Sequence, residues 1–178
     1  MDNIEKIMIN GLGAELFCPG DCVLTALSGG PDSVFLLYAL RELNRVNSLG
    51  MTIAAAHLDH GLRGAASEQD RRFAATLCAE LSVELISEKT DVGKIPGASV
   101  EEKARIARYA FLEKTAARNG YTKVATGHTR DDLAETVLLR VIRGTGLRGL
   151  AAIRPVRPLS VRSGILLVRP LLETCKKD

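Results

Sequence analysis

The sequence predicts an α/β fold, with a doubly wound parallel sheet of about five strands and helices on both of its faces. Short apolar runs alternate along the chain with longer segments of helical periodicity, which is typical of strands joined by crossover helices. No stretch of about 20–50 residues recurs, so a repeat array is excluded. A chain of 178 residues is long enough for one hydrophobic core, and residues 1–178 are expected to form one domain.

The first half of the chain supplies three of the expected strands. Apolar runs predict the strands, and apolar residues three or four positions apart predict the helices between them. In order, these are a strand at 22–27, a helix at 32–44, a strand at 52–57, a polar loop at 58–66, a helix from 67 and a strand at 83–86. Ser67 and Asp70 have the spacing of a capping box, so the second helix is expected to begin at Ser67.

The second half continues the alternation. Ser99 and Glu102 form another capping box, and Asn119 with Gly120 ends the helix that follows it. The remaining elements are a strand at 123–126, a helix at 131–142 and a strand at 165–168. Ligands of doubly wound sheets bind at the carboxyl ends of the strands. The segments 28–33, 57–64 and 127–132 are therefore expected to face a ligand.

The segment Ser28–Ser33, Ser-Gly-Gly-Pro-Asp-Ser, leads from the first strand into a helix. Its two glycines allow a sharp turn that brings the backbone close to an anion, and the helix N-terminus favours phosphate. Asp32 beside a phosphate implies a cation or a catalytic task, because two anions repel each other. The alternative is an ordinary turn in which Asp32 or Ser28 caps the helix. The segment matches neither the Walker A loop nor the G-x-G-x-x-G motif.

The hexapeptide resembles the PP-loop of the N-type ATP pyrophosphatases, which split ATP between its α and β phosphates. Four further segments, at 57–64, 101–109, 127–136 and 143–150, are followed by Arg-Pro-Leu-Leu at 169–172. Together they resemble the isoleucine-tRNA lysidine synthetases over residues 20–172. This resemblance implies that ATP adenylates the wobble cytidine of a CAU-anticodon isoleucine tRNA, and that free L-lysine then displaces AMP to form lysidine.

The resemblance also assigns residues. It implies that residues 1–178 are the ATP-binding catalytic domain of a longer protein, ending before domains that hold the tRNA. Mg²⁺ is expected to bind with ATP near Asp32, and no cluster of protein side chains is expected to form a separate metal site. The implied ATP-binding residues are Ser28, Gly29, Gly30, Pro31, Asp32, Ser33 and His57; the implied catalytic residues are Asp32, Arg105, Arg108 and Asp132; Asp132, Arg143 and Arg148 are assigned to lysine or tRNA.

Physical chemistry supports these assignments and leaves alternatives. Arginine offers two parallel donors to the charge that develops on phosphate, and a carboxylate such as Asp132 can hold an ammonium and accept its proton. Arg105 and Arg108 are alternatively solvated helix residues, and Asp131 and Asp132 are alternatively helix caps. Arg143 and Arg148 are alternatively part of a solvated loop. His57, Asp59, His60 and His128 are interpreted as residues lining the nucleotide or tRNA entrance rather than as metal ligands.

The composition disfavours a membrane-spanning or exported protein. No apolar run approaches the roughly 20 residues that span a bilayer, no export signal opens the chain, and a cytoplasmic protein is expected. The net charge of +3 neither requires nor excludes nucleic acid. Two rival functions remain: a PP-loop tRNA thiolase, which the lack of C-x-x-C motifs disfavours, and a nucleotide-binding module without catalysis. A homodimer is left open.

Overall fold

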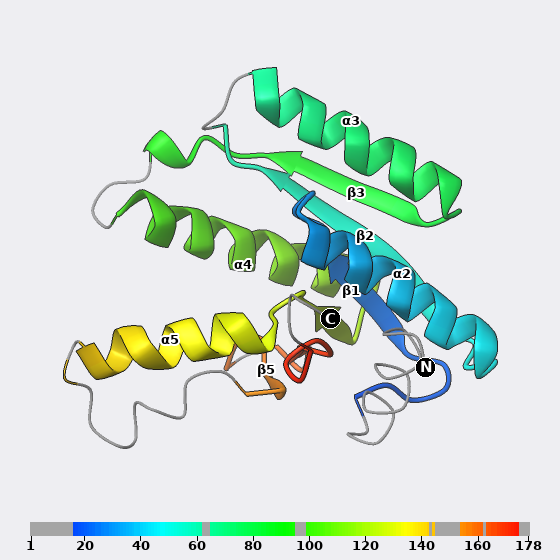
Figure 1. The fold of residues 1–178 in the computed structure, drawn as a ribbon. Helices are drawn as coiled ribbons and strands as arrows, with labels where there is room; N and C mark the ends of the chain where they lie inside the picture. Colours follow the sequence, from blue (N-terminus) through cyan, green and yellow to red (C-terminus); the bar gives the residue numbers. More distant parts are fainter. Residues whose placement is uncertain are drawn as a thin grey trace.

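The computed structural model describes residues 16–61, 65–94, 99–142, 144, 154–161 and 163–174. They form one six-stranded sheet with the order β3-β2-β1-β4-β6-β5 (Figure 1). The strands are β1 (Cys22–Ala26), β2 (Thr52–Asp59), β3 (Glu84–Lys89), β4 (Lys123–Ala125), β5 (Val156–Pro158) and β6 (Leu166–Val168). The helices are α2 (Pro31–Val46), α3 (Ala65–Glu80), α4 (Val100–Asn119) and α5 (Arg130–Ile142), with a short 3₁₀ turn η1 (Val92–Lys94). The predicted α/β class is confirmed.

The two faces of the sheet carry different helices. Side chains of successive strand residues point to opposite faces, so Val23 packs with α2 whereas Leu24 packs with α4. The α2 face continues onto α3, whose Ala74 and Leu77 pack beside Ala55 of β2. Both faces of the central strands are therefore buried. This explains why their sequences are continuous apolar runs rather than alternating ones.

The crossovers fix where a ligand can bind. Strands β1, β2, β3, β4 and β6 are all parallel, and only β5 runs antiparallel to its neighbour β6. After β1 the chain moves outward through β2 and β3, and it then returns to place β4 on the other side of β1. The sheet thus has its topological switch point between β1 and β4, where a crevice opens at the carboxyl ends of the strands.

Most boundaries agree with those expected from sequence. Ser99 caps α4 by accepting a hydrogen bond from the Glu102 N–H at 3.3 Å, and Gly120 ends the helix at a φ of 75°. Two expectations are wrong. Helix α3 already contains Ser67, since it begins at Ala65, so Ser67 does not cap it. The sheet also contains β5, which was not expected from the sequence. This strand has three residues and includes Arg157 and Pro158, so it shows no apolar run.

Candidate active site

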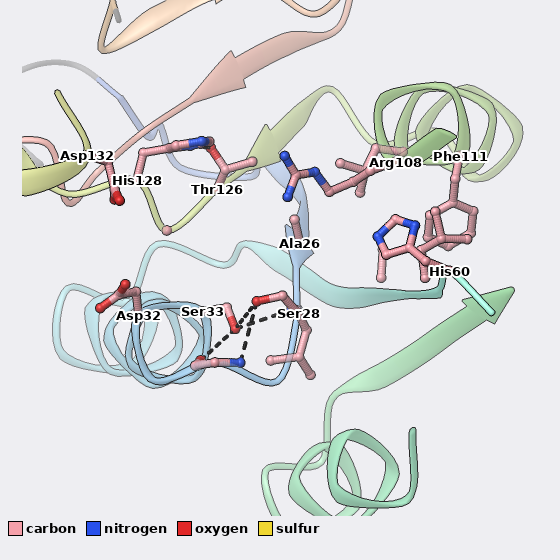
Figure 2. Close-up of a pocket in the computed structure, with 16 residues that line it drawn as sticks. Ala26, Ser28, Asp32, Ser33, His60, Arg108, Phe111, Thr126, His128 and Asp132 are labelled. Carbon is pink, nitrogen blue, oxygen red and sulfur yellow. Dashed lines mark hydrogen bonds between the residues drawn. The ribbon is translucent and has the colours of Figure 1, made fainter. Parts of the chain in front are cut away.

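A cavity of about 320 Å³ opens at the carboxyl ends of β1, β2 and β4. It lies at the switch point, as the topology requires. Figure 2 shows the turn after β1 on one side of this cavity and residues of α4 and of the β4–α5 connection on the other. All three segments that the sequence placed at this edge contribute to it: Ser28 after β1, His60 after β2 and His128 after β4.

The turn Ser28–Ser33 is held by its own serines. The Ser28 N–H donates to the Ser33 hydroxyl oxygen at 3.2 Å, and the Ser33 hydroxyl donates to the Gly30 carbonyl oxygen at 2.8 Å. Gly29 has a φ of +88°, which residues with a Cβ rarely adopt. Gly30 is the N-cap of α2 and Pro31 follows it, with no side chain capping the helix. The capping alternative for Ser28 and Asp32 is therefore wrong.

This turn has the geometry of an anion cradle. An uncapped helix N-terminus presents backbone N–H groups and a partial positive charge. The side chains of Ser28, Asp32 and Ser33 line the cavity beside it. Because Gly30 has no side chain, nothing at that position keeps a phosphate from the backbone.

The two arginines on α4 occupy different environments. Arg108 lines the cavity, and Figure 2 shows its guanidinium on the wall opposite Ser28 and Ser33. Arg105 does not line the cavity; its guanidinium pairs with Glu102 at 2.6 Å, and its side chain is 55% exposed. Of these two candidates, only Arg108 lies where it can reach a nucleotide bound to the turn.

The three histidines differ in whether they line the cavity. The Nδ1 atom of His57 lies 2.9 Å from the carbonyl oxygen of Leu27, in the buried sheet and outside the cavity lining. His60 and His128 line the cavity. His128 Nδ1 lies 2.9 Å from the Thr126 hydroxyl. The expectation that all the histidines border the entrance thus holds for two of them, while His57 joins β1 to β2.

Both lining histidines are electrically neutral near pH 7. Burial lowers the pKa of His60, and the nearby Arg108 lowers it further. Burial also lowers the pKa of His128, to about 4, and the cations of Arg169 and Arg108 add to this effect. The buried Nδ1 atom of His60 has no hydrogen-bond partner among the described residues. Neither histidine therefore adds positive charge to the cavity.

Asp132 both contacts the start of α5 and lines the cavity. Its carboxylate accepts hydrogen bonds from the N–H and the hydroxyl of Thr129, at 2.7 and 3.0 Å, which secures the start of α5. It also lines the cavity, where Figure 2 places its carboxylate opposite Asp32. The contact with Thr129 agrees with the capping alternative, and the cavity position keeps a role in binding open.

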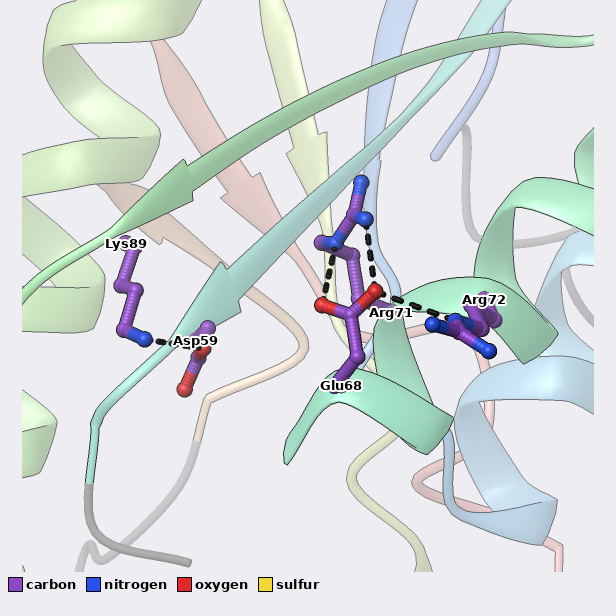
Figure 3. Close-up of polar contacts among 5 residues, drawn as sticks. All are labelled: Asp59, Glu68, Arg71, Arg72 and Lys89. Atoms are coloured by element: carbon purple, nitrogen blue, oxygen red, sulfur yellow. Dashed lines mark hydrogen bonds and ion pairs between the residues drawn. The ribbon is translucent and has the colours of Figure 1, made fainter. Parts of the chain in front are cut away.

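The rim on the β2 side is held by ion pairs (Figure 3). Asp59 lies 3.8 Å from the Lys89 ammonium. Burial raises the pKa of Asp59, but hydrogen bonds from Gly61 and Ser67, together with the charges of Lys89 and His57, keep this pKa below its usual range. On α3, hydrogen bonds from Arg71 and Arg72 lower the pKa of Glu68 to about 2. The Asp59–Lys89 pair joins β2 to β3, whereas the pairs of Glu68 lie within the first turns of α3.

Two oxygen-bearing side chains of the cavity could hold Mg²⁺ beside a bound nucleotide. Asp32 and the Ser33 hydroxyl provide oxygen ligands of the kind that Mg²⁺ prefers, beside the anion cradle. The described residues contain no group of three or more His, Cys, Asp or Glu side chains that could hold a metal alone. The remaining ligands would be phosphate oxygens and water.

Several lining residues carry no signal in the sequence. Phe111 and Leu112 of α4, with Ala56 and Leu58 of β2, form an apolar wall that is suited to a planar base. They belong to ordinary apolar stripes and gain their position only from packing. Arg143 and Arg148 lie outside the described residues. Within the described part, no helix is long and apolar enough to cross a membrane.

Comparison with known proteins identifies relatives of this chain. The family model described as a PP-loop domain matches residues 3–178. The chain is 43% identical over 162 residues to the tRNA(Ile)-lysidine synthase of Dehalococcoides mccartyi, covering 88% of this chain and 34% of that protein. It is 38% identical over 182 residues to the tRNA(Ile)-lysidine synthase of Chlorobaculum tepidum, covering 100% of this chain and 52% of that protein. The chain thus spans between a third and about half of these relatives.

A solved structure shares the fold. The U34-tRNA thiolase NcsA from Methanococcus maripaludis, with its [4Fe-4S] cluster, superposes with a TM-score of 0.79 at 20% sequence identity. The match covers 98% of this chain and 59% of that chain. At this identity the match shows a common architecture, including a sheet of the same kind with helices on both faces.

Proposed function

The chain belongs to the PP-loop domain family, and from this premise we propose that it is the ATP-dependent catalytic domain of a tRNA(Ile)-lysidine synthase. In the proposed reaction, the 2-carbonyl oxygen of the wobble cytidine attacks the α-phosphorus of ATP, and the bond to pyrophosphate breaks. The ε-amine of free lysine then attacks C2 of the activated base. AMP leaves with the oxygen, and the amine loses a proton.

The observation that carries this proposal is the opposition of the Ser28–Ser33 turn and Arg108 across one cavity. The turn binds the β and γ phosphates through its N–H groups and serine hydroxyls. Arg108 donates two parallel hydrogen bonds to the α-phosphate, where negative charge develops as the new bond forms. Mg²⁺ held between Asp32 and the phosphates would neutralise the leaving pyrophosphate.

The second step needs a neutral amine, although lysine is an ammonium at pH 7. Asp132 lies on the same cavity, so its carboxylate can hold that ammonium near the activated base and accept a proton from it. His60 and His128 add no positive charge, because their pKa values are lowered. Repulsion of the incoming ammonium by these two histidines is thereby avoided.

The thiolase alternative is disfavoured by the position of the cysteines. Cys78 is buried in the core cluster beneath α3, and Cys22 begins β1 at the opposite end of the strand from the cavity. Cys18 precedes β1 at that same opposite end, and none of these three described cysteines is in a disulfide. A sulfur-transferring thiol is therefore not positioned beside the cradle in the described residues.

The experiment that tests the proposal measures pyrophosphate exchange and lysine incorporation. The intact protein is incubated with ATP, Mg²⁺, labelled lysine and an isoleucine tRNA with a CAU anticodon. We expect label in the tRNA and AMP in equal amount, with little label in a methionine tRNA of the same anticodon. Exchange that is independent of tRNA would contradict cytidine adenylation, and ATP binding without exchange would favour the non-catalytic module.

A further inference from the structure

One stretch of the chain carries basic residues without any acidic residue between them. Residues 143–172 contain six arginines and no acidic residue. The whole chain has 24 basic and 21 acidic residues, so the remainder is net negative. The described part of this stretch includes the antiparallel pair β5 and β6, which lies at the edge of the sheet beyond β4. A single-sign field of this kind favours a polyanionic partner.

Two of these arginines meet beside the cavity wall. Arg157 of β5 lies with its guanidinium carbon 5.5 Å from the centre of the Tyr109 ring. Arg169 follows β6 at the carboxyl edge and donates from Nη1 to the Arg154 carbonyl oxygen at 2.6 Å. Tyr109 also interacts with Arg169 and raises its pKa, against the lowering by burial. On the other side, Arg108 is 5.6 Å from the same ring, which connects this pair to the cavity.

The pair has cationic neighbours, and among the described residues no carboxylate pairs with it. Neither Arg157 nor Arg169 forms an ion pair with any described residue. Burial and the charge of Arg157 both lower the pKa of Arg169. The same two guanidiniums contribute to lowering the pKa of the nearby His128.

One nitrogen of the pair is also unsatisfied. Arg169 is 6% exposed, and its buried Nε has no hydrogen-bond partner among the described residues. A buried donor without an acceptor costs free energy, and the like charge of nearby Arg157 adds to that cost. A bound anion would relieve both. Arg157 donates from Nη1 to the carbonyl oxygens of Pro158 and Leu159, at 2.7 and 3.1 Å, so the other donors of its guanidinium are left for a ligand.

We propose that Arg157 and Arg169, gathered at Tyr109, form a second anion site that binds a phosphodiester of the RNA substrate. The cradle at Ser28–Ser33 is across the cavity and takes the ATP phosphates, so the two sites place RNA and nucleotide on either side of Arg108. Arginine suits this role because its planar fork matches two phosphate oxygens. That the phosphodiester belongs to RNA rests on the proposed function, whereas the anion site itself does not.

The test uses the intact protein and its Arg157→Gln variant. Arg157 is half-buried near the surface, and its removal takes away no core side chain. Binding of a single-stranded RNA with the CAU anticodon loop sequence is titrated at several salt concentrations, beside titrations of ATP and inorganic phosphate. Arg118→Gln is the matched control, since Arg118 is an exposed arginine at the far end of α4. Arg157→Lys keeps the charge but lacks the fork.

We expect Arg157→Gln to weaken RNA binding about tenfold, to reduce the slope of log affinity against log salt by about 0.7–1, and to leave ATP affinity unchanged. Arg157→Lys should fall between it and the unchanged protein, and Arg118→Gln should match the unchanged protein. Lost affinity for ATP with RNA binding intact would overturn the RNA assignment. Equal effects of Arg157→Gln and Arg118→Gln, or none, would overturn the site. Both titrations measure binding and require no catalysis. Their result can therefore be interpreted even if the lysine incorporation assay fails.

Discussion

Gly127, in the connection between β4 and α5, lies against the backbone of Asp32 in the first turn of α2. A Cβ at Gly127 would be 2.9 Å from the Asp32 carbonyl oxygen and 3.2 Å from the Ser33 nitrogen. Two backbone segments thus touch at the point where the cavity floor joins β1 to β4. Because neither partner is a flexible side-chain end, any side chain at Gly127 must displace the cradle.

Gly127→Ala should therefore affect both stability and nucleotide binding. We expect the free energy of unfolding to fall by about 1–3 kcal/mol, as overpacking forces the backbone apart. ATP affinity should fall as well, since the cradle shifts. Urea unfolding and ATP titration measure the two effects. Gly164→Ala is the control: a Cβ there meets nothing within 4 Å, so its stability should stay within about 0.5 kcal/mol. Equal stability of both variants would contradict the close contact.

Gly30→Val separates folding from binding. Gly30 has φ −76° and ψ 159°, a conformation open to residues with side chains, and its Cβ would meet only the Ser28 hydroxyl at 3.7 Å. We expect a folded protein whose ATP affinity is at least about tenfold weaker, because the side chain occupies the phosphate position. By contrast, Gly29→Ala should lose about 1–2 kcal/mol of stability, since the φ of Gly29 is +88°. Normal ATP affinity in folded Gly30→Val would place the phosphates elsewhere.

Substitution of the two α4 arginines distinguishes their roles. Arg108→Lys keeps the charge but loses the second parallel donor, so we expect adenylation to slow by about 10²-fold with little change in stability. Arg105→Lys should stay within about twofold, because Arg105 only pairs with Glu102 on the surface. Pyrophosphate exchange measures both. A larger loss in Arg105→Lys would mean that Arg105, and not Arg108, meets the α-phosphate.

His128 predicts a dependence of stability on pH. Its pKa is about 4 in the folded protein, below the usual 6.5, so the unfolded chain binds more protons between these values. The stabilisation is complete above pH 6.5 and is lost as the pH falls toward 4. The expected loss is about 3 kcal/mol. His128→Asn should flatten the plot of unfolding free energy against pH over this range. Above pH 6.5 the two proteins should differ by an amount that no longer depends on pH. An unchanged slope would show that His128 is not held neutral.

The sequence by itself determined the fold class and the segments at the ligand edge. Apolar runs and helical periodicity act locally, so β1, α4 and the caps Ser99 and Gly120 could be read from neighbouring residues. The hexapeptide Ser28–Ser33 was equally readable, because an anion cradle is built from consecutive backbone groups.

Only the tertiary structure decided which distant residues meet. The sequence did not separate Arg105 from Arg108; packing of α4 places Arg108 in the cavity and leaves Arg105 with Glu102. Arg157 lies in β5, a strand that local sequence patterns do not predict. This strand is held in the sheet by its pairing with β6. Contacts between residues that are far apart in the sequence depend on the topology of the crossovers and on the packing of the whole chain. A local sequence pattern does not contain this information.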